Sequence, residues 1–338
     1  MTGAVIVTGG AGYIGSHAAK ALSRAGYEPV AYDNLSIGNA SAVRWGPLEL
    51  GDIADRARLG EVFRRHRPVG VLHFAALALV GESMTEPGLY YRTNVGGALA
   101  VMDAARAAGV EAFVLSSTCA VYGVPPPGPI GEATPPAPIN PYGASKLMAE
   151  RMLADHGAAY GLPYMALRYF NAAGADPEGE IGELRARETH LVPLAVDAML
   201  GRRPPVGVLG TDYPTPDGTA IRDYVHVSDL ADAHVRALER LRGGGGSGVL
   251  NLGTGRGHSV REVLAAVERA GGAPVPREDR PRRPGDPPSL VADAAAARAA
   301  LGDGLTARSD LDTIVSTALA WHRGEVASTA HRLGLKGG

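Results

Sequence analysis

A glycine-rich loop near the start of the chain sets the strongest limit on the fold. The segment TGGAGYIG, residues 8–15, follows an apolar, β-branched run at 4–9 and opens a helical pattern. Gly9, Gly12 and Gly15 allow a tight turn and a close approach to a ligand, and the helix start offers free N–H groups to a phosphate. These features predict a strand–loop–helix unit that binds the pyrophosphate of a dinucleotide.

An acidic residue at the end of the second predicted strand favours one dinucleotide over another. Asp33 ends the run at 29–33. A carboxylate there can accept hydrogen bonds from both ribose hydroxyls of an adenosine and repels a 2′-phosphate. We therefore expect NAD rather than NADP as the cofactor. Asp52, in GDI, is a weaker candidate for a place beside the adenine, since it could equally be a turn aspartate.

Strand and helix patterns alternate along the first half of the chain. Strands are expected at 4–9, 29–33, 69–76 and 112–118, and helices at 16–26, 59–66 and 94–109. This alternation predicts an α/β fold with a Rossmann-type, doubly wound parallel sheet. The later part predicts a smaller C-terminal α/β region that binds the substrate.

The expected division of the chain has two parts and an end segment. The cofactor part comprises 1–171 and about 221–254, the substrate part about 172–220 and 255–322, and 323–338 form a loose tail.

Composition argues against several kinds of partner. The net charge is −2 and aromatic residues make up 5% of the chain, so we expect no nucleic acid and no membrane surface as partners. The single cysteine cannot form an internal disulfide, which fits a reducing compartment, and the first residues are typical of a strand rather than of a signal peptide. We expect a cytoplasmic protein.

The stretch PYGASKLMAE contains one of only three lysines in the chain. If Asn140 caps a helix that begins at Pro141, Tyr142 and Lys146 lie on one helix face. An ammonium near a phenol favours the phenolate, so we expect a pKa of Tyr142 lowered towards neutrality. A tyrosinate can take a proton from an alcohol as hydride leaves its carbon. The alternative is a structural pair on the helix surface.

The predicted strand AFVLSST ends in three hydroxyl residues. In such sheets the carboxyl ends of the strands face the cofactor crevice. Thr118, the last of the three, could therefore donate a hydrogen bond to the reacting oxygen. The alternative is a hydroxyl that caps the backbone at the strand end.

The chain resembles a known family in a series of motifs that occur in one order: TGGAGYIGSH, YDNL, GDI, HFAALALVGES, SSTCAVYG, PYGASK, RYFNAAGA, DYPTPDGTAIRDYVHVSDLADAH, NLGTG and PRRPGDPP. Together they resemble the extended short-chain dehydrogenase/reductase family, in its UDP-glucose 4-epimerase branch, over about residues 3–322. The resemblance implies a tightly held NAD that is not consumed, a UDP-sugar substrate, and a homodimer formed through helices around 94–108 and 143–158.

The resemblance also implies roles for particular residues. Tyr142 is the expected base, Lys146 tunes it and anchors the nicotinamide ribose, and Thr118 binds the sugar oxygen. The expected cofactor site consists of Gly9, Gly12, Tyr13, Ile14, Gly15, Asp33, Asn34, Asp52, Ile53, Phe74, Ala75, Ala76, Asn94, Ser116, Tyr142, Lys146, Tyr169 and Phe170. The expected substrate site consists of Thr118, Tyr142, Asn171, His190, Leu191, Arg222, Arg283, Asp286 and Leu290. No metal is expected.

Some residues depart from the family pattern. Ala78 stands where family members commonly carry a lysine near a cofactor phosphate, which predicts a weaker grip on NAD or a substitute cation. Leu290 stands where a large tyrosine often closes the sugar pocket, so N-acetylated sugars could fit. His190 stands where an asparagine also occurs and is a candidate polar contact to the substrate.

The positions after Thr118 separate the expected activity from its relatives. A nucleotide-sugar dehydratase needs an Asp–Glu pair there, and the related decarboxylases need a glutamate at the second position. This chain has Cys119 and Ala120, and we expect Cys119 to be a small buried residue rather than a nucleophile. The expected reaction is C4 epimerisation of UDP-galactose and UDP-glucose. The alternatives are a 4-epimerase of another nucleotide sugar (a UDP-N-acetylhexosamine, a UDP-pentose or a dTDP-sugar), and, less favoured, a dehydratase or a non-catalytic NAD-binding regulator.

Overall fold

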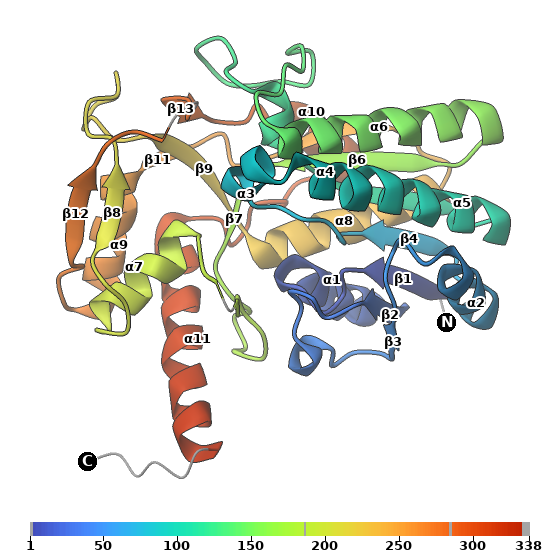
Figure 1. Cartoon of the computed structure of the whole chain (residues 1–338), viewed down its shortest axis with the longest axis horizontal. Coiled ribbons are helices and arrows are strands. Elements are labelled where there is room, and N and C mark those ends of the chain that lie inside the picture. Colours follow the sequence, from blue (N-terminus) through green and yellow to red (C-terminus); the bar gives the residue numbers. More distant parts are fainter. Residues whose placement is uncertain (1–2, 186, 284–285, 333–338) are drawn as a thin grey trace.

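A parallel sheet of seven strands forms the larger part of the molecule. The computed structural model describes residues 3–185, 187–283 and 286–332. The strand order is β10-β6-β5-β4-β1-β2-β3, in which β1, β4 and their neighbours run in the same direction (Figure 1). The strands are β1 (Ala4–Thr8), β2 (Glu28–Asp33), β3 (Leu48–Leu50), β4 (Gly70–His73), β5 (Ala112–Thr118), β6 (Tyr164–Tyr169) and β10 (Gly248–Leu252). This is the doubly wound, Rossmann-type order that the sequence predicts.

Helices bury both faces of this sheet, which is why most of its strands are largely apolar. On one face α1 (Tyr13–Arg24) packs on β1, and α8 (Val227–Arg242) packs beside it on β4, β5 and β6, in a core that includes Val5 and Leu230. On the other face α2 (Arg56–His66), α5 (Ala98–Ala108) and α6 (Pro141–Tyr160) share a second core. The short helices α3 (Val80–Thr85) and α4 (Pro87–Tyr90) and a π-helical turn (Tyr91–Gly97) lead into α5.

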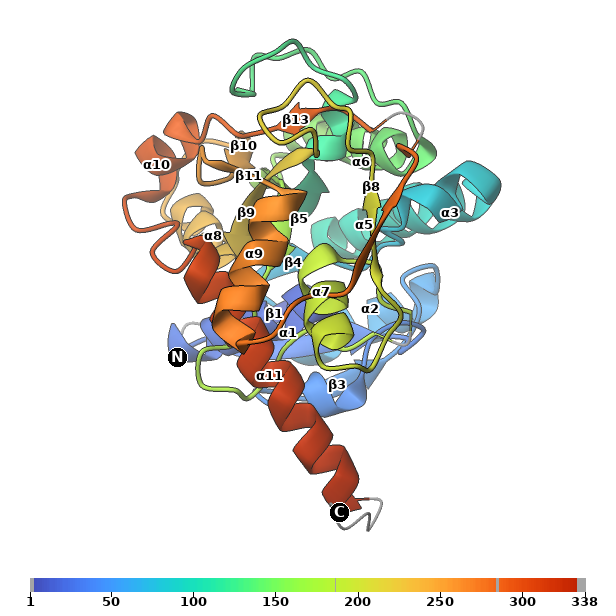
Figure 2. The same ribbon diagram turned by 90° about the vertical axis from the view of Figure 1, so that its left-hand side faces the viewer.

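A second region is built around the central strand β9 (Ile221–His226). Strand β9 pairs with β7 (Asn171–Ala173), β11 (Gly257–Ser259) and β13 (Ser289–Leu290). The remaining elements are β8 (Val206–Leu209), which pairs with β12 (Arg277–Arg280), and the helices α7 (Leu191–Met199), α9 (Val260–Gly271), α10 (Ala295–Leu301) and α11 (Leu311–Arg332). Figure 2 shows α7, α9 and α11 together on the face of the molecule that this region forms. Short 3-10 turns occupy Ala40–Ala42 and Cys119–Tyr122.

The expected elements of the first half are present with small shifts of their ends. The expected strand at 29–33 is β2 (Glu28–Asp33), and the expected helix at 16–26 begins earlier, as α1. From residue 323 the chain does not form the expected loose tail at once, because α11 continues to Arg332; residues 333–338 lie outside the described residues. The division into a cofactor part and a substrate part stays a prediction. Within residues 221–254, α8 and β10 lie with the large sheet, whereas β9 is the central strand of the second sheet.

Among the helices of the described residues, none combines the length and the apolar character that crossing a membrane requires.

Candidate active site

The glycine loop between β1 and α1 has the geometry of an anion site. Gly9 has φ +72°, and a Cβ there would lie 2.7 Å from the backbone nitrogen of Ala75, so a residue with a side chain does not fit. Gly12 is the N-cap of α1, where no side chain accepts a cap hydrogen bond, and the first turn carries no acidic residue. The first N–H groups of the helix therefore remain for a ligand, and the positive end of the helix dipole favours a phosphate.

Asp33 is fixed at the end of β2 beside this loop. Its two carboxylate oxygens accept hydrogen bonds from the backbone N–H groups of Ala11, at 3.0 Å, and Leu35, at 2.8 Å. The side chain of Asn34 donates to Asp52 at 2.8 Å, so these two expected cofactor residues lie together. A carboxylate oxygen has two lone pairs, so Asp33 can still accept ribose hydroxyls. The glycine loop and Asp33 thus fit the pyrophosphate and ribose of NAD.

The other expected cofactor residues fall into two kinds. Asn94 is buried and fully used, because it binds both backbone groups of Leu77 and the hydroxyl of Ser145. The hydroxyls of Ser116 and Tyr169 lie 2.6 Å apart at the carboxyl ends of β5 and β6. By contrast, four of the residues contribute apolar packing: Ile53, Phe74, Ala75 and Phe170.

The remaining expected cofactor positions are Tyr13 and Ile14, which are the first residues of α1, and Ala76, which follows β4 by a few residues. The hydroxyl of Tyr13 donates to the carbonyl of Gly174 at 2.6 Å.

Helix α6 begins as the sequence predicts. Asn140 is the N-cap and accepts from the backbone N–H of Gly143 at 2.8 Å, and Pro141 is the first helical residue. A Cβ on Gly143 would lie 2.5 Å from the carbonyl oxygen of Ala120, so the glycine lets the helix start approach the turn after β5. This approach places Tyr142 beside Thr118, and the side chains of these two residues are hydrogen-bonded.

Lys146 is buried and points at the end of β5. Its Nζ donates to the carbonyl oxygen of Ser116 at 3.0 Å. Burial lowers the pKa of Lys146 to about 8, although the carboxylate of Glu150 acts in the opposite direction. The structural alternative, a pair on the helix surface, does not describe this lysine.

The expected lowering of the pKa of Tyr142 by Lys146 is wrong for the protein chain by itself. Burial raises the pKa of Tyr142 well above its usual value, and the nearby phenol of Tyr169 acts in the same direction. The hydrogen bond with Thr118 lowers it, but by less. The prediction failed because a short sequence does not show how strongly a phenol is desolvated.

Two of the expected UDP-binding residues are paired with each other. Arg222, on β9, donates to Asp286 at 3.1 Å and to the carbonyl of Pro287 at 3.0 Å. Leu290 lies opposite Arg222 in the β13–β9 pair and is buried in a cluster with Cys119 and Phe170. This strand pair therefore brings candidate substrate residues next to the turn that follows Thr118.

The other expected substrate residues lie at the edges of this arrangement. Arg283 is exposed and its carbonyl accepts from the N–H of Asp286. Asn171 begins β7, which pairs with β9, and Leu191 begins α7.

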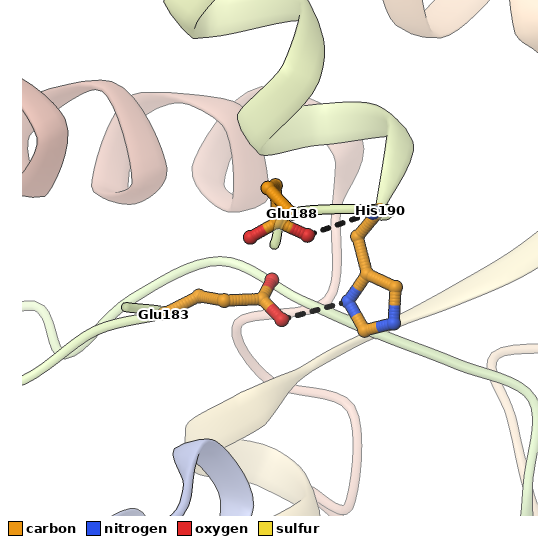
Figure 3. Close-up of side chains that lie close together, drawn as sticks. All are labelled: Glu183, Glu188 and His190. Atoms are coloured by element: carbon orange, nitrogen blue, oxygen red, sulfur yellow. Dashed lines mark hydrogen bonds and ion pairs between the residues drawn. The ribbon is translucent and has the colours of Figure 1, made fainter. Parts of the chain in front are cut away.

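His190, the N-cap of α7, takes part in a charged cluster (Figure 3). Its Nδ1 lies 2.8 Å from Glu183, which Arg185 also approaches at 2.8 Å, while Glu188 accepts from the backbone N–H of His190. Although burial favours a neutral carboxyl, His190 and Arg185 hold the pKa of Glu183 below its ordinary value. Burial and the charge of Glu183 raise the pKa of Glu188. Since the guanidinium of Arg185 already balances the charge of Glu183 and the imidazole of His190 contacts the same carboxylate, the cluster is a polar network of the protein itself.

Sequence reasoning missed several buried polar residues around the site. Asp223, next to Arg222, accepts from the backbone N–H groups of Thr254, Gly255 and Ala292, and so joins the NLGTG turn to the segment after β13. Glu150 forms a buried ion pair with Arg168. In the sequence, these residues stand out only as charged residues within or next to a motif. That position does not reveal which partner each residue binds.

Comparison with known proteins agrees with this geometry. Residues 5–253 match the NAD dependent epimerase/dehydratase family. A UDP-glucose 4-epimerase of Rhizobium leguminosarum bv. trifolii is 54% identical over 318 residues, which cover 94% of this chain and 97% of that protein. The crystal structure of UDP-glucose 4-epimerase from Brucella ovis in complex with NAD is 56% identical, with a TM-score of 0.91 and coverage of 94% of this chain and 97% of that one.

A third relative is known with two ligands. The crystal structure of UDP-glucose 4-epimerase from Bifidobacterium longum in complex with NAD+ and UDP is 37% identical, with a TM-score of 0.89 and coverage of 96% and 99%. On its motifs, its sheet order and the residues gathered at the ends of β1, β2 and β5, the chain belongs to the NAD dependent epimerase/dehydratase family.

Proposed function

We propose that the protein catalyses the reversible C4 epimerisation of a UDP-hexose, interconverting UDP-galactose and UDP-glucose, with NAD as a bound cofactor. The observation that carries this proposal is the convergence of Thr118, Tyr142 and Lys146 at the end of β5, without an acid in the two positions that follow. Similarity to UDP-glucose 4-epimerases over nearly the whole chain supports it.

In this proposal Tyr142 moves the proton of the sugar 4-hydroxyl. NAD, when bound, would supply a reversible hydride acceptor for C4 and a positive charge in the site. Tyr142 takes the hydroxyl proton as the C4–H bond breaks and gives it back when the bond forms again. Because burial raises the pKa of this phenol, nearby positive charge is needed to ionise it, and the ammonium of Lys146 is one source. Thr118 holds the sugar oxygen.

The residues after Thr118 restrict the chemistry to exchange between alcohol and ketone. Burial raises the pKa of Cys119 to about 12, so its thiol is neither a nucleophile nor an acid at neutral pH. Ala120 has no proton to give. Elimination of water from the sugar needs an acid and a base at these positions, and neither is present.

Arg222, Arg283 and Asp286 are the proposed grip on UDP. A guanidinium fork binds two phosphate oxygens at once, and a carboxylate can accept from a ribose hydroxyl. Arg222 already contacts Asp286 at 3.1 Å, so the ion pair holds both side chains near β13. A tightly held nucleotide leaves the sugar free to turn over, which presents the other face of C4.

The test is an incubation of purified protein with UDP-galactose, followed by separation of the products. We expect UDP-glucose without net consumption of NAD, and release of bound NAD on denaturation. Tyr142→Phe should keep the fold and the cofactor but lose at least about 100-fold in kcat, because general base catalysis contributes about 10²–10⁴-fold. Tyr160→Phe, the same change at the exposed end of α6, is the control. If the wild-type protein forms no UDP-glucose, the proposal is wrong.

The proposed breadth of the substrate range rests on Leu290. Leucine is smaller than the tyrosine common at this position in the family, so UDP-N-acetylglucosamine is proposed as a second substrate. A side-by-side assay decides this, and no detectable conversion of the N-acetylated sugar contradicts it. The same panel should include dTDP-sugars, because their turnover would show that the base of the nucleotide is not selected.

We also propose a homodimer formed through α5 and α6, which lie next to each other on one side of the molecule (Figure 1). The proposed compartment is the cytoplasm. It rests on the single cysteine, Cys119, which is buried and free.

A further inference from the structure

A buried ion pair lies directly behind the catalytic set. Glu150 is on α6, one turn after Lys146, and Arg168 is on β6. Two nitrogens of the guanidinium contact the two carboxylate oxygens, at 2.9 Å and 2.6 Å, and both residues are 5% exposed. A buried pair of this kind is often no more stabilising than apolar residues of the same volume, because both charges lose their hydration. A contribution to stability therefore does not explain why this ion pair is present.

The pair completes a register between α6 and the end of β5. Three consecutive residues of β5 each contact one residue of α6, and the helix residues are spaced by four. The carbonyl of Ser116 accepts from Lys146, the hydroxyl of Ser117 donates to Glu150, and the side chain of Thr118 bonds Tyr142. The middle contact does not involve an expected catalytic residue, and Arg168 ties its glutamate to β6.

The network continues from Arg168 towards the expected substrate side. The guanidinium donates to the hydroxyl of Tyr122 at 2.9 Å, and this hydroxyl donates to Asn251 at 2.8 Å. The amide of Asn251 donates to the carbonyl of Ile130 at 2.8 Å. The N–H of Ile130 in turn donates to the carbonyl of Val291, the residue after Leu290. One chain of hydrogen bonds thus links α6 to the strand that faces Arg222.

Glu150 is also the negative charge that acts on Lys146. From its own helix Glu150 acts on Lys146, and from β4 His73 lies within its electrostatic reach. From β6, Arg168 pairs with Glu150, and the hydroxyl of Tyr169 contacts that of Ser116, whose carbonyl accepts from Lys146. Burial lowers the pKa of His73 to about 3 and raises that of Tyr169 to about 12, so both are neutral near pH 7. Among these neighbours only the carboxylate of Glu150 favours the ammonium form of Lys146.

We propose that Glu150 is a positioning residue for this site: held by Arg168, it fixes α6 on the end of β5 and supplies the counter-charge for the buried ammonium of Lys146. The part of this inference that concerns turnover rests on the proposed function. The part that concerns the charge of Lys146 stands by itself.

The test compares Glu150→Gln with Glu150→Asp. Glutamine removes the charge that favours the ammonium form of Lys146. The alkaline limit of kcat, which is the pH at which kcat falls because Lys146 loses its proton, should therefore move to lower pH by about one unit or more. We expect kcat to fall at least about 10-fold while KM stays within about two-fold. Aspartate keeps the charge but is too short for all three contacts, so kcat should fall without a shift of the limit. Asp229→Asn, which removes another buried carboxylate that pairs with an arginine, is the control and should leave the pH limit unchanged.

Lysine side-chain NMR tests the charge without any turnover. The chain has three lysines, so protein labelled with ¹⁵N at lysine Nζ gives three side-chain signals, and Lys146→Met assigns the one of interest. The signal of Lys146 should titrate at lower pH in Glu150→Gln. That of Lys20, which carboxylates surround, should not move.

Each outcome decides the matter. Unchanged titration of Lys146 in Glu150→Gln, or a loss of kcat no larger than that of Asp229→Asn, overturns the inference. A shifted titration in a protein that does not epimerise any sugar refutes the proposed function and keeps the charge role. If Glu150→Gln does not fold, Glu150→Gln/Arg168→Met removes both charges of the pair and should fold. Wild-type kcat and a wild-type pH limit in that double variant also overturn the inference.

Discussion

Both lysines among the described residues are buried, although the chain uses arginine for nearly every other basic position. Lys146 reaches a carbonyl oxygen at the end of β5, and Lys20 reaches three carboxylates. An ammonium is compact and can donate in several directions, whereas a guanidinium is wide, flat and donates as a fork. The positions that retain lysine are thus ones where the shape of the cation matters, and not only its charge.

Lys146→Arg should therefore keep the charge and lose the activity. The Nζ of Lys146 is 3.0 Å from its acceptor in a site that is 3% exposed, so the larger guanidinium must displace Tyr142 or the end of β5. We expect a loss in kcat of about 100-fold or more, of the size that loss of the base itself causes, with bound NAD and the melting temperature measured in parallel. Lys20→Arg is the matched control, because carboxylates accept a guanidinium readily. Near wild-type kcat in Lys146→Arg would show that the site does not need an ammonium.

At this scale the sequence showed which residues meet but not how their environments alter them. The cap at Asn140, the helix start at Pro141 and the common face of Tyr142 and Lys146 were predicted from local rules, and the structure confirms them. The pKa of Tyr142 was predicted with the wrong sign, because burial depends on chain segments far away in the sequence. Gly143 was not singled out at all, since its role depends on the carbonyl of Ala120, more than 20 residues earlier.

At the scale of elements, the loop 174–183 lies along α1 and is held there by charge. The ammonium of Lys20 contacts Asp176 at 2.7 Å, Glu178 at 2.9 Å and Glu180 at 2.6 Å. The first turn of the same helix holds the start of the loop through the Tyr13–Gly174 hydrogen bond. Since α1 begins at the glycine loop, the loop 174–183 connects β7 of the second region to the expected cofactor site.

Replacing Lys20 with methionine should destabilise the fold strongly. Asp176, whose side chain is 2% exposed, would keep its charge without a partner, and breaking a buried pair in this way costs about 3–5 kcal/mol. Lys20 lowers the pKa of Asp176, so this stability is present above the unfolded-state pKa of the aspartate and is lost as pH falls through the folded-state value. Urea unfolding at pH 7 measures the effect. Arg24→Met, on the exposed side of the same helix, should leave the midpoint almost unchanged, and equal losses in both variants would contradict this account.

Two strands that the sequence did not predict each contain a buried charge. The strands β6, YMALRY, and β9, IRDYVH, each interrupt an apolar run with a charged residue, Arg168 and Asp223, which is buried through a specific partner. Periodicity treats such a residue as exposed, because a charge is rarely buried without compensation. The compensation comes from Glu150 and from the backbone of residues 254–255, so only the folded chain reveals it.

At the scale of the whole molecule, α6 has two faces with different tasks. One face carries Lys146 and Glu150 towards β5, and the opposite face exposes Met148, whose surface is 47% accessible. Methionine is enriched at interfaces between subunits relative to the rest of a protein surface. In a dimer formed through α5 and α6, the helix that carries the expected base would be held from both sides.

Met148→Glu should therefore separate the subunits without unfolding them. We expect wild-type protein at about 10 µM to have the mass of two chains in light scattering after size exclusion, because stable homodimers have dissociation constants well below this concentration. A charge placed in the proposed interface costs several kcal/mol of association energy when it has no partner, so the variant should have the mass of one chain. Leu50→Glu, which adds the same charge at an exposed leucine at the end of β3, is the control and should stay dimeric. Far-UV circular dichroism checks that both variants are folded, and a wild-type protein with the mass of one chain, or a Met148→Glu variant that remains dimeric, excludes this face as the interface.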